Sequence, residues 1–364
     1  MHFRGRQPVM RAGLVLVAVA LAACSSSSSS SSSTSTGSSS APASGSTSLS
    51  GTLNGSGSSF QTVFQQSAIQ AFRQVDPGIT VNYGSGGSGK GRTDLASGVV
   101  NFAGSDSPIP STELPSFNGK KVLYFPVVIG PITMSYNLPG VSSLKLSPTV
   151  IANIFQGKIT KWNDPAITAI NSGVSLPSTP ITLAVRSDSS GTTQNFSLFL
   201  MTAVPSVWTL GSSSTIKWPS SARAGAGNGG VAQIVKTTPG AIGYVDYADA
   251  KATGLSFASV ANSSGAYVSP SPSAASVSAA GVTVAPNLTF HAVWGSGAGA
   301  YPITYQSWVL VYAVQRNAND AALLKAYLGY LLGAGQQLLS NLGYASVPTS
   351  IDQQAQAQLS QITG

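Results

Sequence analysis

The sequence has few of the side chains that carry covalent and metal chemistry. It contains one cysteine and two histidines in 364 residues, so no disulfide can form within the chain. The cysteine is Cys24 and the histidines are His2 and His291. No group of His, Cys, Asp and Glu has the spacing of a metal site. We therefore expect neither a metal nor a cofactor.

Charged residues are also scarce, at 8% of the sequence, although the net charge is +8. The lysines and arginines are scattered and form no stripe with interleaved aromatic residues, which argues against nucleic acid as a partner. A mild positive field favours small anions instead. Polarity comes mainly from Ser, Thr, Asn and Gln, a composition typical of an exported protein.

No apolar run is long enough to span a bilayer. Residues 1–24 carry a basic start and an apolar core over 14–20, the pattern of an export signal. The small residues before Cys24 resemble a bacterial lipobox, so Cys24 is predicted to become the lipidated (palmitate-bearing) first residue of the mature protein. Residues 25–50 are almost entirely Ser, Thr, Gly, Ala and Pro. Such a segment cannot bury enough apolar surface to fold, which predicts a disordered tether.

About 314 residues remain, enough for one large or two medium domains. Strand-like and helix-like apolar patterns alternate in this part, which favours α/β layers with helices on both sheet faces. Residues 252–300 are rich in Ser, Ala and Gly and are predicted to contain surface loops. The predicted helices cover 59–75, 146–155, 320–332 and 336–342, and the predicted strands cover 79–83, 102–104, 122–136, 181–185, 241–245 and 308–314.

A hydroxyl-rich run at 186–192 precedes a further predicted helix. Phe196 and Phe199 lie on one face of that helix, and Pro205 ends it. The run offers one fixed cation, Arg186, together with hydroxyls and the unpaired N–H groups of a helix N-terminus, a combination that favours an anion. An ordinary helix cap beside a solvated arginine is the alternative that this run alone leaves open.

Three further polar clusters, at 57–59, 84–91 and 105–106, follow predicted strands, and ligands of α/β sheets bind at such strand ends. The stretch from Gly84 to Lys90 resembles a Walker A loop. However, Gly91 stands where a Ser or Thr would hold Mg²⁺, so NTP hydrolysis is disfavoured. A glycine-rich loop still lets backbone N–H groups approach an oxyanion. A flexible turn is the alternative.

Nucleophilic catalysis has little support in this sequence. There is no G-x-S-x-G motif, and His291 is the one histidine beyond the export signal. We expect His291, close to Trp294 in the sequence, to be structural. Asp246 and Asp249 are explained equally well by solvation of a helix or turn. The sequence therefore does not predict an enzyme.

Eight short motifs extend along the folded part in a fixed order: GSGSSF (55–60), VNY (81–83), NFAGSD (101–106), IFQGKI (154–159), WND (162–164), RSDSSGT (186–192), PGAIGYV (239–245) and YPIT (301–304). Together they resemble the substrate-binding proteins of bacterial phosphate ABC transporters, the PstS family, over residues 51–352. The resemblance implies a two-lobed type II periplasmic-binding-protein fold. Each lobe would be a mixed sheet flanked by helices, with the ligand in the cleft between them. The implied lobes are 51–125 with 302–364, and 126–301.

The resemblance also implies a phosphate site made mostly of hydrogen-bond donors. Asp188 would not touch phosphate but would orient Arg186. Ser59 stands where many relatives have Thr, Gln61 stands at a turn that is commonly Pro-rich, and Ser189 replaces a common Gly; none of these changes removes a required donor or acceptor. The implied phosphate-binding residues are Ser59, Phe60 through its backbone N–H, Ser88, Asp106, Arg186, Ser190, Gly191 and Thr192.

Asp106 is the implied residue that bears on the choice of anion. A carboxylate in an anion site makes sense only as the acceptor for a proton on the ligand. Phosphate carries such a proton near neutral pH and sulfate does not. Sites built to bond a substrate hydroxyl reject analogues that lack it by about 10⁴–10⁵. The alternative is that Asp106 caps a turn with Ser105 and Ser107.

The resemblance implies a non-enzymatic protein outside the cytoplasmic membrane that binds inorganic phosphate and delivers it to an ABC importer. Its partners would be the permease and ATPase of that importer and the membrane, reached through lipid on Cys24; the protein itself would be a monomer. Two alternatives remain open. One is an enzyme acting on phosphate esters, and the other is a phosphate-sensing or adhesive surface protein on the same fold.

Overall fold

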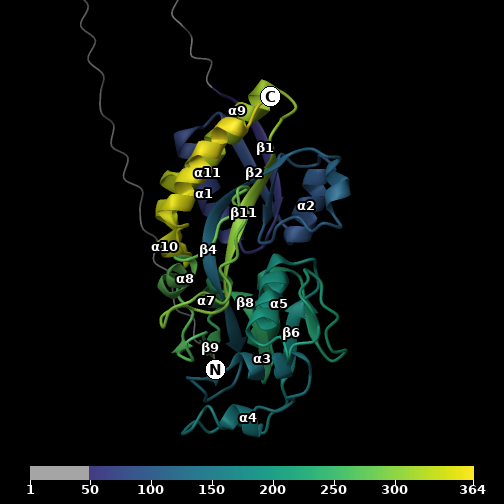
Figure 1. Ribbon diagram of the computed structural model, residues 1–364, viewed down its shortest axis with the longest axis vertical. Coiled ribbons are helices and arrows are strands. Elements are labelled where there is room, and N and C mark those ends of the chain that lie inside the picture. Colours follow the sequence, from purple (N-terminus) through teal and green to yellow (C-terminus); the bar gives the residue numbers. More distant parts are fainter. Residues whose placement is uncertain (1–48) are drawn as a thin grey trace, which may run out of the picture. The chain divides into compact units, whose positions relative to one another are not determined.

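The computed structural model describes residues 49–364. The predicted export signal, Cys24 and nearly all of the predicted tether lie outside the described residues. The described part forms one unit of strands and helices (Figure 1), and none of its helices is long and apolar enough to cross a membrane. Its strands are β1 (Gly51–Gly57), β2 (Ile79–Ser85), β3 (Phe102–Ser105), β4 (Val122–Tyr136), β5 (Lys145–Leu146), β6 (Thr182–Arg186), β7 (Arg223–Gly225), β8 (Ala241–Asp246), β9 (Ser256–Ala261), β10 (Tyr267–Val268) and β11 (Thr304–Tyr312). Its helices are α1 (Thr62–Val75), α2 (Ser88–Ala96), α3 (Pro148–Phe155), α4 (Pro165–Thr168), α5 (Gly191–Ala203), α6 (Gly227–Thr237), α7 (Tyr247–Thr253), α8 (Pro272–Ala279), α9 (Ala318–Leu332), α10 (Leu339–Leu342) and α11 (Thr349–Gln358), with 3₁₀ turns η1 (Leu114–Phe117), η2 (Ala334–Leu338) and η3 (Leu359–Gln361).

The first group of paired strands has the order β2-β1-β3-β11-β4. β1 runs parallel to β2 and β3, with Leu53 opposite Val81, whereas β11 runs antiparallel to β3 and β4. Helices α1 and α9 lie on one side of these strands and α2 lies on the other (Figure 1). Because β1, β2 and β3 are parallel, their carboxyl ends meet at one edge, where side chains on the following loops can converge.

The long strand β4 joins this group to a second one. Residues 122–131 of β4 pair with β11, whereas residues 132–136 pair with β8, which continues into β6 and β7. β4 is thus shared between the two groups of strands, with β11 beside its first part (Figure 1). The change of partner falls between Pro131 and Ile132. The division into lobes at 125/126 and 301/302 stays a prediction.

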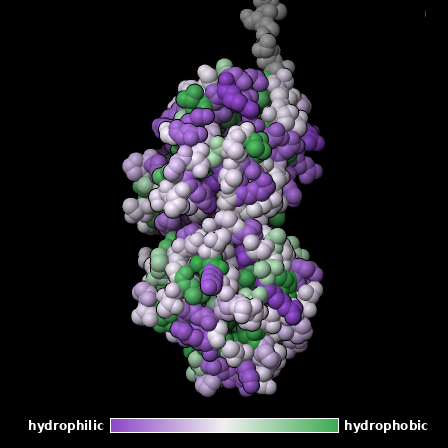
Figure 2. Space-filling view, turned by 90° about the vertical axis from the view of Figure 1, so that its right-hand side faces the viewer, coloured by the Kyte–Doolittle hydropathy of each residue, from purple (hydrophilic) through white to green (hydrophobic). Residues whose placement is uncertain are grey.

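The core follows from the apolar content of β4 and of the helices packed on the sheets. Fourteen of the fifteen β4 residues are buried, as expected for a strand covered on both faces. Phe60 packs on Tyr305 and Tyr344, with ring centroids 4.1 and 5.1 Å apart, and so fixes the loop after β1. On the face shown in Figure 2, hydrophobic residues form small separate patches among hydrophilic ones, and the surface is indented between its upper and lower halves.

Most of the predicted elements are confirmed, and the mixed α/β fold is as expected. The run at 186–192 does precede a helix, α5, and the Ser147 hydroxyl caps α3 by accepting the Val150 N–H at 3.3 Å. Some expected boundaries differ from the structure: β11 spans Thr304–Tyr312 rather than 308–314. α1 begins at Thr62 rather than at 59, and the predicted loop at 84–91 is divided between β2 and α2.

Residues 252–300, predicted to contain surface loops, also contain β9, β10 and helix α8, elements that the sequence did not predict. The Ser271 hydroxyl accepts the Ala274 N–H at 3.1 Å, and Pro272 occupies the first turn of α8, two features that favour a helix start. The sequence did not predict this helix, because its Ala and Ser side chains are small and give no strong apolar period.

Candidate functional site

The four polar clusters predicted from the sequence meet in the structure. β1, β2, β3 and β6 each end within one of them. The Gly89 N–H, on the cluster after β2, donates to the Ser189 carbonyl, on the cluster after β6, at 3.0 Å. The amide of Asn195, on α5, donates to the Asp106 carbonyl, on the cluster after β3, at 2.7 Å. Segments far apart in the chain therefore form one polar centre.

Asp106 is the buried carboxylate of this centre. Its Oδ1 accepts the hydroxyls of Ser58 and Ser307, both at 2.5 Å, and its Oδ2 accepts the Ser88 hydroxyl at 3.3 Å. Burial raises the pKa of Asp106, and the three hydroxyls and the Arg186 charge oppose that rise. Oδ2, with the longer bond, is the oxygen better placed to accept a further proton.

The turn-cap alternative for Asp106 is not what the structure shows. The hydroxyls of Ser105 and Ser107 both accept from the Arg92 guanidinium, at 3.2 and 3.1 Å, and Ser105 donates to the Ser107 carbonyl. Arg92 also pairs with Glu113 through two hydrogen bonds of 2.6 and 2.9 Å. The two serines thus hold the loop through Arg92, which leaves the Asp106 carboxylate directed at the polar centre.

Arg186 is held in place by Asp188, as the sequence predicted. The Nε of Arg186 donates to Asp188 Oδ1 at 2.8 Å, Nη2 donates to Oδ2, and Nη1 reaches the Thr192 hydroxyl at 3.3 Å. Burial acts to raise the pKa of Asp188, but the Arg186 guanidinium and the Gly227 N–H outweigh it and lower that pKa. The planar guanidinium is therefore locked in one orientation.

The start of α5 lies directly beside Asp106. The Ser190 hydroxyl caps this helix by accepting the Thr193 N–H at 3.1 Å. A Cβ on Gly191 would lie 2.4 Å from the Ser88 hydroxyl and 2.5 Å from the Asp106 Cβ. Only glycine allows this approach, and it brings the positive end of the α5 dipole against the polar centre.

A Gly191→Ala protein is expected to unfold at lower urea concentration than the wild type. The added methyl group must displace Ser88 or Asp106, and overpacking of this kind costs about 1–3 kcal/mol. The control is Gly229→Ala on α6, where a Cβ meets no atom within 4 Å. Equal stability of the two variants would contradict the close approach at Gly191.

Asn228 belongs to the centre and was not predicted. Its backbone N–H and its side-chain amide both donate to the Ser59 hydroxyl, at 3.2 and 3.1 Å, and the amide also reaches the Thr192 hydroxyl at 3.2 Å. It is the second residue of α6, after Gly227, which has a φ of 66° and donates its N–H to Asp188 at 3.0 Å. The glycine-flanked asparagine after a strand was a signal that could have indicated it.

Three further residues were singled out in the sequence: Phe60, Asp246 and His291. The Phe60 N–H, implied as a ligand donor, bonds the Ser58 hydroxyl at 3.1 Å. Asp246 caps α7 by accepting the Asp249 N–H at 2.9 Å. Burial and the nearby Asp249 charge raise the pKa of Asp246 well above its usual value. His291 lines a separate hollow of about 580 Å³ beside Ser107 and Ser189.

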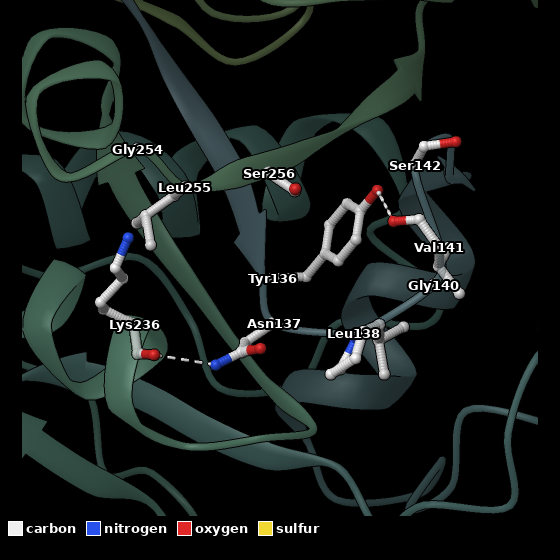
Figure 3. Close-up of a pocket in the computed structure, with 11 residues that line it drawn as sticks. Tyr136, Asn137, Leu138, Gly140, Val141, Ser142, Lys236, Gly254, Leu255 and Ser256 are labelled. Atoms are coloured by element: carbon white, nitrogen blue, oxygen red, sulfur yellow. Dashed lines mark hydrogen bonds between the residues drawn. The ribbon is translucent and has the colours of Figure 1, made fainter.

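The described part also has hollows away from this centre. One of about 530 Å³ lies beyond the end of β4, and Figure 3 shows its lining side chains. There the Asn137 amide donates to the Lys236 carbonyl at 2.9 Å and the Tyr136 hydroxyl donates to the Val141 carbonyl at 3.2 Å. None of the predicted binding residues lines it, and its polar groups bond to one another.

The chemistry of the polar centre is that of a receptor for a protonated oxyanion. It combines one fixed cation, several hydroxyls, a helix N-terminus and one buried acceptor. Among residues 49–364, no group of three or more His, Cys, Asp and Glu could hold a metal ion. The centre can bind and orient an anion through directional hydrogen bonds.

The joined sheets and this centre define a binding protein of the periplasmic type. Residues 40–334 match the model of a PBP superfamily domain. Within that superfamily, the chain belongs to the PstS family of phosphate-binding proteins. Phosphate-binding protein PstS 3 of Mycobacterium leprae is 36% identical over 315 residues, which cover 82% of this chain and 84% of that protein. Phosphate-binding protein PstS of Pasteurella multocida is 34% identical over 332 residues, or 86% and 91% of the two chains.

Solved structures share the fold at lower identity. A phosphate-binding protein from Stenotrophomonas maltophilia is 20% identical, with a TM-score of 0.70 over 84% of this chain and 93% of that one. A structure with bound phosphate from Clostridium perfringens is 17% identical, with a TM-score of 0.60 over 82% and 100% of the two chains. These likenesses confirm the predicted type II periplasmic-binding-protein fold.

Proposed function

We propose that this protein binds inorganic phosphate outside the cytoplasmic membrane and delivers it to an ABC importer. One observation carries the proposal: a fixed guanidinium, a helix N-terminus and several hydroxyls converge on a buried carboxylate, Asp106. Donors supply affinity for an oxyanion, and the acceptor selects one that carries a proton. The relatives named as phosphate-binding proteins support the same ligand.

We assign the ligand contacts to both groups of strands. Ser59, Phe60, Ser88 and Asp106 follow strands of the first group, and Arg186 and the start of α5 belong to the second. Hydrogen bonds to charged groups contribute about 1.5–3 kcal/mol each, so a few of them suffice for micromolar binding, roughly −8 kcal/mol. We propose that the lobe formed by 51–125 and 302–364 closes on the lobe formed by 126–301 in a hinge motion. This closure would bring both sets of contacts onto the ligand.

Isothermal titration of the protein with phosphate and with sulfate tests this function. We expect a dissociation constant of micromolar order or tighter for phosphate and no measurable heat for sulfate at the same concentration. No heat with phosphate would overturn the proposal. Turnover of a chromogenic phosphomonoester, with or without added divalent metal, would instead support an enzyme.

Asn228→Ala is expected to weaken phosphate binding about tenfold. The change removes the amide that holds the hydroxyls of Ser59 and Thr192, and each such bond is worth about 0.5–1.5 kcal/mol. Titration calorimetry measures the effect. The control is Asn171→Ala, since Asn171 is equally buried and bonds the Lys145 backbone at 2.8 and 2.9 Å away from the site. Equal affinities of the two variants would remove Asn228 from the binding machinery.

We also propose that lipid on Cys24 anchors the protein as a monomer at the outer side of the membrane. The lipobox-like sequence supports this part of the proposal. Cys24→Ser is expected to move the protein from the membrane fraction to the soluble fraction and to lower its mass by that of the acyl groups. Mass spectrometry and fractionation measure both. An unchanged distribution would contradict the anchor.

A further inference from the structure

Three of the most exposed apolar side chains of the described part lie at one end of the first strand group. Val75, Val99 and Val314 are 62%, 68% and 70% exposed. Val75 ends α1 shortly before β2, Val99 precedes β3, and Val314 follows β11. β2 and β3 are parallel to β1, and β11 is antiparallel to β3, so all three valines lie at the edge opposite the anion centre.

Cations lie at the same edge. Lys120, Lys121 and Arg316 line a groove of about 390 Å³ together with Tyr312 and Val314. The Lys120 ammonium lies 5.3 Å from the Tyr312 ring centroid, and the Lys121 ammonium donates to the Gln361 side chain at 2.8 Å. Arg316 pairs with Asp320 at 3.1 Å while remaining 72% exposed. The edge is therefore both apolar and positively charged.

The chain also enters the described unit at this edge. The Asn319 amide, three residues after Arg316, donates to the Ser50 carbonyl at 3.3 Å. Asn101 lines the groove. The Asn54 N–H donates to the Asn101 side-chain carbonyl at 2.9 Å, and the Asn101 N–H donates to the Asn54 backbone carbonyl at 2.7 Å. Twenty-five residues lie between Cys24 and Ser50, and a flexible Ser-rich linker of that length spans about 28 Å on average.

We propose that this valine–lysine edge, formed by Val75, Val99, Val314, Lys120, Lys121 and Arg316, docks on an anionic phospholipid surface. Cations near such a surface are attracted to lipid phosphates, and exposed valines gain by entering the interfacial layer. The groove of about 390 Å³ offers space for a lipid headgroup beside the lysines. The inference takes its setting from the proposed membrane anchorage, but it concerns a separate surface.

Vesicle sedimentation of residues 24–364 carrying Cys24→Ser, so that neither the predicted export signal nor an acyl chain contributes, tests the proposal. The probes are vesicles of equal phosphatidylglycerol and phosphatidylcholine, and vesicles of phosphatidylcholine alone. We expect binding to the anionic vesicles only, weakening as salt rises. Adding Lys120→Gln with Lys121→Gln should weaken it about twenty-fivefold, since each cation at such a surface is worth roughly a factor of five.

Two matched controls separate this surface from general charge and hydrophobicity. Lys158→Gln with Lys161→Gln removes the same charge from exposed positions flanking the end of α3 and should leave vesicle binding unchanged. Val99→Ser with Val314→Ser should weaken it about tenfold, whereas Val277→Ser, at a site 44% exposed on α8, should not. All these variants are expected to bind phosphate like the parent.

Equal binding to both kinds of vesicle would overturn the proposal. So would an equal loss of vesicle binding in the Lys120/Lys121 variant and in the Lys158/Lys161 variant. A concentration-dependent dimer that the Lys120 and Lys121 changes abolish would assign the edge to a second copy of the chain and would also overturn it. Phosphate titration of the same samples reports on the proposed function independently. A failure of vesicle binding is therefore distinguishable from a failure of phosphate binding.

Discussion

The Asp106→Asn protein is expected to lose most of its discrimination between phosphate and sulfate. On the proposed assignment, Asp106 Oδ2 accepts the proton of phosphate and repels an anion that lacks one, a kind of selection worth about 10⁴–10⁵. An amide in its place can turn its NH₂ group to an unprotonated oxygen. Competition titrations with both anions should show the affinity ratio falling at least a hundredfold. An unchanged ratio would place the selectivity elsewhere.

The same substitution has an expected effect on stability that depends on pH. Because burial raises the pKa of Asp106 in the folded state, its ionisation favours the unfolded state. The wild type should therefore lose stability relative to Asp106→Asn as pH rises from about 4, the usual carboxyl value, through the raised pKa. Thermal unfolding across that range measures the difference.

The control for that difference is Asp352→Asn on α11. The pKa of Asp352 is also raised by burial, but Asp352 contacts no residue of the anion centre. This variant should share the sign of the stability change and keep the wild-type phosphate-to-sulfate ratio. If Asp352→Asn altered the ratio as well, the effect of Asp106→Asn would have to be attributed to a general change in the protein.

Replacing Arg186 by lysine is expected to weaken phosphate binding by about 30- to 100-fold. The fixed guanidinium uses Nε and Nη2 to hold Asp188 and keeps Nη1 beside Thr192. A lysine ammonium is a point charge on a flexible stem and cannot hold Asp188 and face the ligand at once. The loss of one charge-assisted hydrogen bond, about 1.5–3 kcal/mol, sets the size of the effect.

Titration calorimetry of Arg186→Lys beside Arg223→Lys tests this expectation. Arg223 is exposed on β7, and its Nη1 donates to the Thr238 hydroxyl at 3.1 Å. Its replacement should leave the affinity at the wild-type value. Wild-type affinity in Arg186→Lys would count against direct contact with the ligand. A loss restored by raising the salt concentration would indicate long-range attraction instead.

Local sequence was sufficient for several parts of the site. The hydroxyl-rich run before α5 predicted a capped helix, and the Ser190 hydroxyl does cap it. The pairing of Arg186 with Asp188, two residues apart, is short-range and was predicted with the resemblance. The secondary structure of the Walker-like stretch was not predicted from the sequence. In the structure, Gly84 and Ser85 belong to β2, whereas Ser88 to Lys90 begin α2.

Long-range partners were beyond the reach of the sequence. Ser307 donates to Asp106 across 201 positions of chain, and Asn228 reaches Ser59 across 169. Neither serine nor asparagine is distinctive in a protein whose polarity comes mainly from such residues. Their roles depend on which strand ends meet, and a one-dimensional pattern does not state that.

The amino-acid sequence by itself determined the chemical character of this protein. Few His, Cys and charged residues disfavoured metal and nucleophilic catalysis, and the ordered motifs gave the family and its fold. The tertiary structure alone decided how Asp106 is presented. Two hydroxyls bond to one carboxylate oxygen, the other oxygen has a longer bond, and the start of α5 lies close to that second oxygen. The physical reason is that helix caps and adjacent ion pairs are fixed by neighbours in the chain, whereas burial and orientation of a carboxylate depend on strands brought together by packing.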